Sequence, residues 1–189
     1  MSTVQETDVV AVLTHDHREV EQMFTELERL SPSDMERRRQ LTEKVIIELV
    51  RHAVAEEAYL YPAVRRVVPG GDQLADRELA EHAEAEKTMK RLEQTDVADP
   101  GHAALLKQLM MEIRTHIREE EDELFPQLRA HSDVSQLAEL GRKVQAIKKI
   151  APTRPHPAAP DKPPANMMVG PLTGLVDRMR DAITGRGKD

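Results

Sequence analysis

A short pattern of histidine and glutamate occurs twice in the sequence. Residues 52–62 read HAVAEEAYLYP, and residues 116–126 read HIREEEDELFP. In each stretch a glutamate follows the histidine by four residues, and an aromatic residue followed by proline closes the stretch. Residues four apart project from nearly the same side of a helix, so the imidazole and the carboxylate would lie together. Such pairs can supply the ligands of a metal ion.

The same spacing is found on four segments of the chain. The pairs are His52/Glu56, His82/Glu86 and His116/Glu120, with His17/Glu21 as a fourth candidate. Each histidine continues an apolar stripe, so all four imidazoles are expected to converge in the interior. Buried carboxylates without a counter-charge are very costly and need a cation. A single pair is usually a solvated helix pair, but several in repeat register favour a metal site. Imidazole and carboxylate ligands suit iron or manganese, with zinc as an alternative.

The repeat extends beyond the two quoted stretches. Residues 52–65 match residues 116–129 at an offset of 64, and DHREVE (16–21) aligns with EHAEAE (81–86) at an offset of 65. We therefore interpret the chain as two helical hairpins, each carrying two of the histidines.

Five helical segments are expected from the apolar periodicity and from the residues that end helices. They span about residues 8–30, 34–68, 72–95, 100–131 and 134–150. Ser33 and Glu36 predict a capping box at the start of the second segment. Four long helices with short connections predict an all-α, up-down-up-down four-helix bundle, with an extra short helix, over residues 1–150.

The composition changes after residue 150. Six of the twelve prolines lie in residues 151–166, so residues 151–170 are interpreted as an extended, Pro-rich linker. Residues 171–189 are expected to form a short amphipathic helix and a tail. This helix would dock on the bundle, mediate self-association or bind a partner.

Composition also excludes several classes of protein. The 189 residues include no cysteine, which rules out disulfides and thiolate metal sites. The net charge is −7 with acidic and basic residues mixed, so no nucleic-acid partner is expected. The sequence has neither a signal-peptide pattern nor the ~20 apolar residues that span a bilayer. A cytoplasmic protein without membrane contact is therefore expected.

These motifs resemble the hemerythrin-like, or HHE cation-binding, family. The resemblance covers about residues 8–150 and rests on DHR (16–18), H-x-x-x-EE-x-x-LYP (52–62), EH (81–82) and H-x-x-EEEDELFP (116–126). It implies a bundle that holds two iron ions, usually with an oxo or hydroxo bridge. Carried over position by position, the implied metal ligands are His17, His52, Glu56, His82, Glu86, His116 and Glu120. Glu56 and Glu120 would bridge the two ions.

One departure from oxygen-carrying hemerythrins bears on function. Their third helix offers a second histidine where this chain has Glu86, a pattern similar to hemerythrin-like proteins of actinobacteria. An added carboxylate favours ferric iron, which makes a poor oxygen carrier. The resemblance thus favours reaction with small oxidants (hydrogen peroxide, O2 or NO), of a catalase-like kind. The alternative is a module that carries, stores or senses O2 or iron without turnover, so an enzymatic role is left open.

Several neighbouring residues are weighed individually. Tyr59 is about 20° from His52 around a regular helix, so it is either a phenolate ligand or proton donor at the site, or a residue packed near the bundle end. Tyr61 would point roughly opposite His52 and is interpreted as structural.

Other acidic and histidine side chains are expected outside the ligand set. Glu21 is an optional eighth ligand and is not included. Glu57 and Glu121, each five residues after a histidine, are expected to cap, to pair or to remain in water. His102 and His156 are expected to be solvated.

Overall fold

The structure, a computed structural model, describes residues 8–157 and Asp177. Its α-helices are α1 (Val9–Arg29), α2 (Met35–Ala55), α3 (Tyr61–Val67), α4 (Gly71–Gln94), α5 (Pro100–Glu119), α6 (Phe125–Ala130) and α7 (Val134–Lys148). A π-helical turn, Glu56–Leu60, joins α2 to α3, and a second one, Glu120–Leu124, joins α5 to α6. Each of these pairs therefore forms one long rod.

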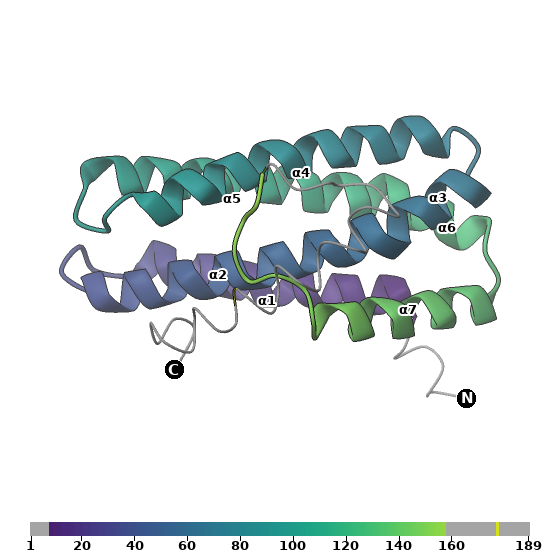
Figure 1. The fold of residues 1–189 in the computed structure, drawn as a ribbon, viewed down its shortest axis with the longest axis horizontal. Helices are drawn as coiled ribbons and strands as arrows, with labels where there is room; N and C mark the ends of the chain where they lie inside the picture. The colour runs from purple at the N-terminus through teal and green to yellow at the C-terminus, as the bar shows by residue number, and fades with distance from the viewer. Residues whose placement is uncertain (1–7, 158–176, 178–189) are drawn as a thin grey trace.

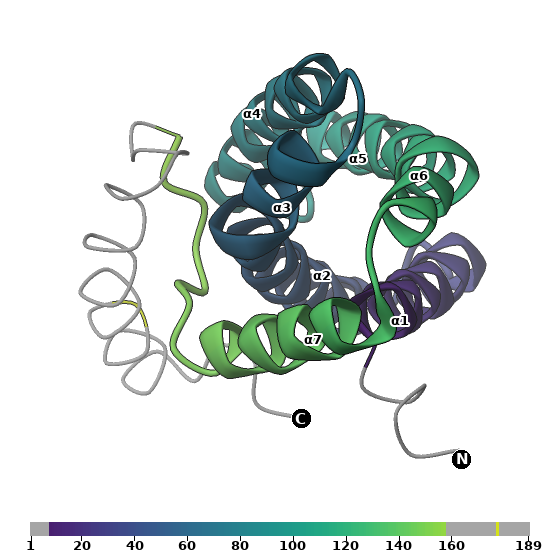
Figure 2. The ribbon, with the colours of Figure 1, turned by 90° about the vertical axis from the view of Figure 1, so that its right-hand side faces the viewer.

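The four rods are α1, α2–α3, α4 and α5–α6, and they lie side by side along the long axis (Figure 1). Seen from the end, they surround a common interior, and α7 lies outside them against α1 and α2 (Figure 2). The predicted all-α four-helix bundle with an extra short helix is confirmed.

Short side chains at the helix starts fix several boundaries. The Asp8 carboxylate accepts a hydrogen bond from the Val10 amide at 2.8 Å, and Asp133 with Gln136 forms a capping box at α7. The predicted capping box at the start of α2 is wrong. Asp34 occupies the N-cap there, and its carboxylate accepts a bond from the Ser31 amide at 3.2 Å, outside the helix.

The apolar core is divided into two clusters. One includes Leu13, Leu79 and Leu124, and the other includes Val20 and Ile113. The four histidines of the repeat fall between these clusters along their own helices, so they form a polar layer across the middle of the bundle.

Residues 151–157, which we call the strap, leave the end of α7 and run across α2 toward α4 (Figure 1). These residues form neither helix nor strand, and they are packed: Ala151 and Thr153 are buried. The backbone amides of Thr153 and Arg154 both donate to Asp177, at 3.1 Å. The rest of the predicted linker and the C-terminal helix, apart from Asp177, lie outside the described residues.

No helix in the described part of the chain is long and apolar enough to cross a membrane.

Candidate metal centre

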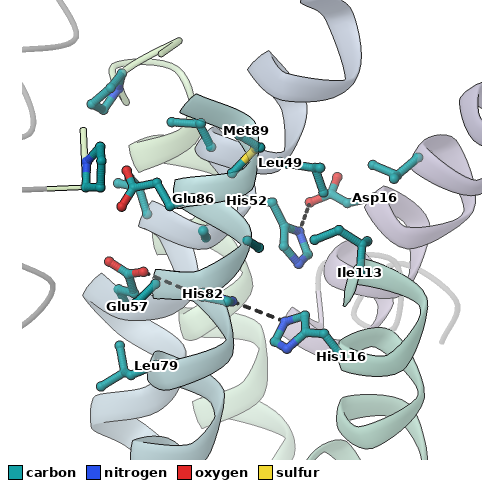
Figure 3. Close-up of a pocket in the computed structure, with 18 of the residues that line it drawn as sticks. Asp16, Leu49, His52, Glu57, Leu79, His82, Glu86, Met89, Ile113 and His116 are labelled. Atoms are coloured by element: carbon teal, nitrogen blue, oxygen red, sulfur yellow. Dashed lines mark hydrogen bonds and ion pairs between the residues drawn. The ribbon is translucent and has the colours of Figure 1, made fainter. Parts of the chain in front are cut away.

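Four histidines from the four rods meet in the polar layer, and all four are buried. The Nε2 atoms of His17 and His52 lie 3.2 Å apart, and those of His82 and His116 lie 3.1 Å apart. The hairpins thus contribute one imidazole pair each, as the repeat predicted. Figure 3 shows His82 and His116 directed toward one another.

Two glutamates connect the imidazole pairs. Glu56 lies 2.9 Å from His52 Nε2 through Oε1 and 3.4 Å from His82 Nε2 through Oε2. Glu120 Oε2 lies 3.3 Å from His17 Nε2 and 3.6 Å from His116 Nε2. Each carboxylate therefore reaches both pairs.

The donor atoms gather closely enough to hold cations. One group consists of His17, His52, Glu56 and Glu120, and a second of Glu56, His82 and His116, with the ligand atoms of each group within 4.8 Å of one another.

The electrostatics of the two glutamates fit a cation. Both side chains are 0% exposed, and Glu56 Oε1, Glu56 Oε2 and Glu120 Oε2 accept no hydrogen bond from the described residues. Burial opposes ionisation of Glu56, but His52 and His82 hold its pKa well below the usual value. When the neighbouring imidazoles are neutral at Nε2, as metal ligands must be, these buried charged oxygens have no donor, and metal ions placed among the nitrogens and oxygens would compensate their charge.

A carboxylate stands behind each imidazole. The Nδ1–carboxylate contacts are His17 with Glu121 at 2.9 Å, His52 with Asp16 at 3.2 Å, His82 with Glu57 at 3.0 Å, and His116 with Glu81 at 3.2 Å. A proton on Nδ1 that is donated to the carboxylate leaves the Nε2 lone pair facing inward, which is the tautomer a metal ligand requires.

In the metal-free state this arrangement favours protonated histidines. Burial lowers the pKa of His52, but Glu56 and Asp16 more than compensate and raise it to about 10. The pKa of His82 is raised to about 9 by Glu56 and Glu57, against the effect of burial. Metal binding therefore has to displace protons from the cluster.

Helix α7 also contributes to the centre. Lys148 Nζ lies 2.6 Å from Asp16 Oδ1, while Asp16 Oδ2 faces His52. Although burial disfavours the charged form, His52 and Lys148 lower the pKa of Asp16. The extra helix thus holds the carboxylate behind one imidazole in its ionised form.

Glu78 is a residue of the centre that the sequence motif did not predict. It is 0% exposed, and its Oε2 lies 3.0 Å from His116 Nδ1. Arg77 donates to Oε1 at 3.1 Å, and the ligand atoms of Glu78, His116 and Glu120 lie within 4.8 Å of one another. A signal was present in the sequence: Glu78 stands four residues before His82 on the same helix face, whereas the motif considered glutamates four residues after a histidine.

Two predicted or optional ligands lie elsewhere. The Glu86 carboxylate accepts a hydrogen bond from the His156 amide of the strap at 2.7 Å, and burial raises its pKa. Among the described residues Glu86 belongs to none of the three groups of candidate ligands. Glu21 is paired with Arg114 at 2.7 Å, so leaving it out of the ligand set is consistent with the structure.

Tyr59 occupies the packed position that was one of its two predicted alternatives, whereas Tyr61 does not lie where it was predicted. Tyr61 is 1% exposed, its hydroxyl donates to Glu120 Oε1 at 3.2 Å, and it lies 3.0 Å from His82 Nε2. Tyr59 packs against the first apolar cluster. The phenol nearest to the imidazoles therefore belongs to Tyr61, and its interpretation as a residue pointing away from the site is wrong.

The π-helical turn explains this exchange. The Tyr61 amide bonds to the Glu56 carbonyl, five residues back, immediately before Pro62, which has no amide hydrogen to donate. The turn in effect inserts one residue and rotates the subsequent side chains by roughly 100°, so Tyr61 turns toward the centre. The second hairpin repeats the device before Pro126, and Phe125 stacks on His17 with ring centroids 5.8 Å apart.

Four further expectations can be compared with the structure. Glu57 and Glu121 do pair, which was one of the expected outcomes, and their partners are His82 and His17 of the candidate centre. The expectation that His102 is solvated is wrong, since it is buried and burial lowers its pKa. His156 is also not solvated as expected: it is half-buried, and its Nε2 lies 2.9 Å from Asp177.

Comparisons with known proteins identify the family of the chain. The family model of the hemerythrin HHE cation binding domain matches residues 8–128 of the sequence. The chain therefore belongs to the hemerythrin HHE cation-binding family, and its buried histidine and glutamate cluster fits a metal site.

Individual relatives extend the comparison. An uncharacterized hemerythrin-like protein of Schizosaccharomyces pombe is 26% identical over 178 residues, covering 94% of this chain and 87% of that protein. A DNA nickase of Nostoc sp. is 28% identical over 149 residues, which cover 78% of this chain but 41% of the nickase. A solved hemerythrin HHE cation binding domain-containing protein from Mycobacterium kansasii has a TM-score of 0.66 at 23% identity, covering 75% of this chain and 85% of that one. This last likeness supports the fold.

Proposed function

We propose that the chain binds two iron ions in the polar layer and decomposes hydrogen peroxide. The observation that carries the proposal is the set of buried oxygens of Glu56 and Glu120 that lack hydrogen-bond donors between two imidazole pairs. Iron bound there would supply electron exchange and Lewis acidity. Two molecules of hydrogen peroxide would give two of water and one of O2, so no external reductant is needed.

The ligand assignment is based on the distances. His17 and His52 would hold one ion, His82 and His116 the other, and Glu56 and Glu120 would be shared between them. Glu78 lies beside His116 where the resemblance had suggested Glu86, so we assign it to the centre in place of Glu86.

Tyr61 would hold a proton beside the centre. Burial, together with the nearby carboxylates of Glu120 and Glu56, raises its pKa well above the usual value. The phenol therefore stays protonated at neutral pH and keeps a donor at Oη, between Glu120 and His82.

Metal content and turnover test the proposal in sequence. Protein purified without added metal or chelator is expected to carry about two irons per chain. The variant His52→Ala is expected to lose most of the metal, and His131→Ala, an exposed histidine, to keep it. Catalytic O2 release from added peroxide by the iron-loaded parent would support the enzymatic assignment. Equal metal content in parent and His52→Ala would contradict the site.

A sensor of oxidants or metal is the second candidate. The strap is bonded to Glu86, which lies one helical turn after His82 on α4, and this contact would link the centre to the C-terminal segment. A sensor would change once on exposure to peroxide and then stop, whereas an enzyme would continue to release O2. The number of peroxide molecules consumed per chain separates the two.

The DNA nicking of the Nostoc relative is not proposed for this chain. The net charge of this chain is −7, so it offers no general attraction for the phosphate backbone of DNA. The cytoplasmic location, and the partner or self-association role of the C-terminal helix, remain predictions.

A further inference from the structure

A cavity of about 130 Å³ lies between α2 and α4, beneath the strap. Its inner end is formed by the four imidazoles of the candidate centre, and its outer end by Glu86, Arg154 and His156. Figure 3 shows Leu49, Met89 and Ile113 near His52, with Glu57 and Glu86 at the left of the view.

The wall between the two ends is mainly apolar. It is made by side chains from three rods: Leu49, Val50, Ala85, Met89 and Ile113. Such a wall offers water no hydrogen-bond partners, so water in the cavity would find partners only at the two polar ends.

The strap forms the roof of this cavity. The His156 amide donates to Glu86 at 2.7 Å, and Arg154 Nη1 donates to Glu93 at 3.4 Å, so the strap is tied to α4 on the far side of the opening. Pro152 and Pro157 also line the cavity. The space is thus covered by a packed part of the chain.

The volume exceeds what a peroxide molecule needs. Water takes a share of about 30 Å³ in the liquid, whereas an apolar cavity of about 150 Å³ in another protein binds benzene or xenon. The cavity under the strap, at about 130 Å³, is close in volume to the cavity that binds benzene or xenon.

We propose that this cavity binds a small apolar molecule, no larger than benzene, and that its occupant restricts the access of peroxide to the centre. The first part stands on the cavity alone. The second part rests on the proposed function, because it concerns the reaction at the imidazole end.

Binding of xenon and benzene to the full chain with its metal tests the first part. Xenon in pressurised crystals is expected between α2 and α4, and titration is expected to show one benzene site. Ala85→Leu fills the cavity and is expected to weaken benzene binding by at least about tenfold. Ala80→Leu, an exposed position on the same helix, is expected to bind as the parent does.

A second variant, which enlarges the cavity, keeps the test valid if Ala85→Leu does not fold. Val50→Ala enlarges the cavity and is expected to admit toluene more tightly than the parent does. Xenon density absent from the cavity, or benzene affinity equal in the parent and a folded Ala85→Leu, would overturn the proposal.

Inhibition of peroxide consumption tests the second part. Benzene is expected to slow O2 release by the parent and Ala80→Leu, with a much smaller effect on Ala85→Leu. If benzene binds but peroxide is not consumed, the proposed function is wrong and the binding site stands. If peroxide is consumed and benzene binds without slowing it, the restriction of access is wrong.

Discussion

At the level of single residues, the imidazoles depend on the carboxylates behind them. Glu57 and Glu121 each stand one residue after a glutamate of the centre, and each faces the histidine of another rod. The adjacent pair EE therefore has two tasks: the first glutamate points to the centre, and the second orients an imidazole. The repeat predicted the first task. The second depends on which rods are neighbours, so spacing along one helix could not predict it.

Glu78 and Glu86 provide a matched test of the ligand assignment. Glu78→Gln is expected to lower iron affinity by about ten- to a hundredfold, because its carboxylate contacts His116. Glu86→Gln also removes one carboxylate from α4 but is expected to retain the parent's affinity. Iron retained against increasing chelator measures both. The reverse order would restore Glu86 to the ligand set.

The two tyrosines can be separated in the same way. Tyr61→Phe is expected to keep the iron but to slow peroxide consumption by roughly a hundredfold, because it removes the proton held at Oη. The fold should tolerate the change, since Phe125 fills the matching position of the other hairpin. Tyr59→Phe is expected to react as the parent does. Unchanged turnover in Tyr61→Phe would exclude a role for its proton.

At the level of elements, regular helices could be predicted and irregular turns could not. The long apolar stripes indicated all four rods and α7 to within a few residues. The position of Tyr61 was misjudged, and that of Tyr59 was left open, because the projection assumed a constant rotation of about 100° per residue through residues 56–60, where the helix is π-helical. Pro62 and Pro126, which have no amide hydrogen to donate, lie two residues after the end of each π-helical turn.

Helix α7 is expected to influence metal affinity through Lys148. Lys148→Met removes the cation beside Asp16, so the pKa of Asp16 should rise and its hold on His52 should weaken. Iron affinity is expected to fall by up to about tenfold. Lys149→Met, an exposed neighbour, serves as the control. Equal affinities in a chelator competition would restrict α7 to a packing role.

At the level of the whole molecule, the centre joins all four rods between two apolar clusters. Removal of the metal leaves a layer of buried charge across the core. The metal-free protein is therefore expected to unfold at a lower temperature than the loaded one, by calorimetry, and His131→Ala should show the same difference. Identical transitions would mean that the layer is balanced without a cation.

The metal-free protein is also expected to depend on pH. The pKa of His52 is raised to about 10 and that of His82 to about 9, whereas a histidine in the unfolded chain has a pKa of about 6.5. Protonation of these histidines therefore stabilises the fold, and this stabilisation is complete below about pH 6.5. That stabilisation is lost as the pH rises through the folded values. The melting temperature should fall between about pH 7 and pH 10 in metal-free protein and much less in loaded protein. A flat profile without metal would show that these imidazoles are already neutral.

The contacts of the strap could not be predicted from the amino-acid composition. Six prolines in residues 151–166 predicted that this segment is neither helix nor central strand, and residues 151–157 form neither. They carried no information on contacts, because a proline-rich segment can be extended either in water or against a surface. Its position over the cavity depends on its contacts with Glu86, Glu93 and Asp177.

The internal repeat has a consequence for how the molecule is assembled. Each hairpin supplies two imidazoles and one glutamate, Glu56 or Glu120, that also reaches the imidazole pair of the other hairpin, and the second hairpin adds Glu78. A chain cut between α3 and α4 would therefore give two fragments, each with only part of the ligands of either ion. Metal ions bound by ligands from both fragments would hold the fragments together. Metal-dependent reassociation of the fragments would therefore test the centre without a measurement of its reactivity.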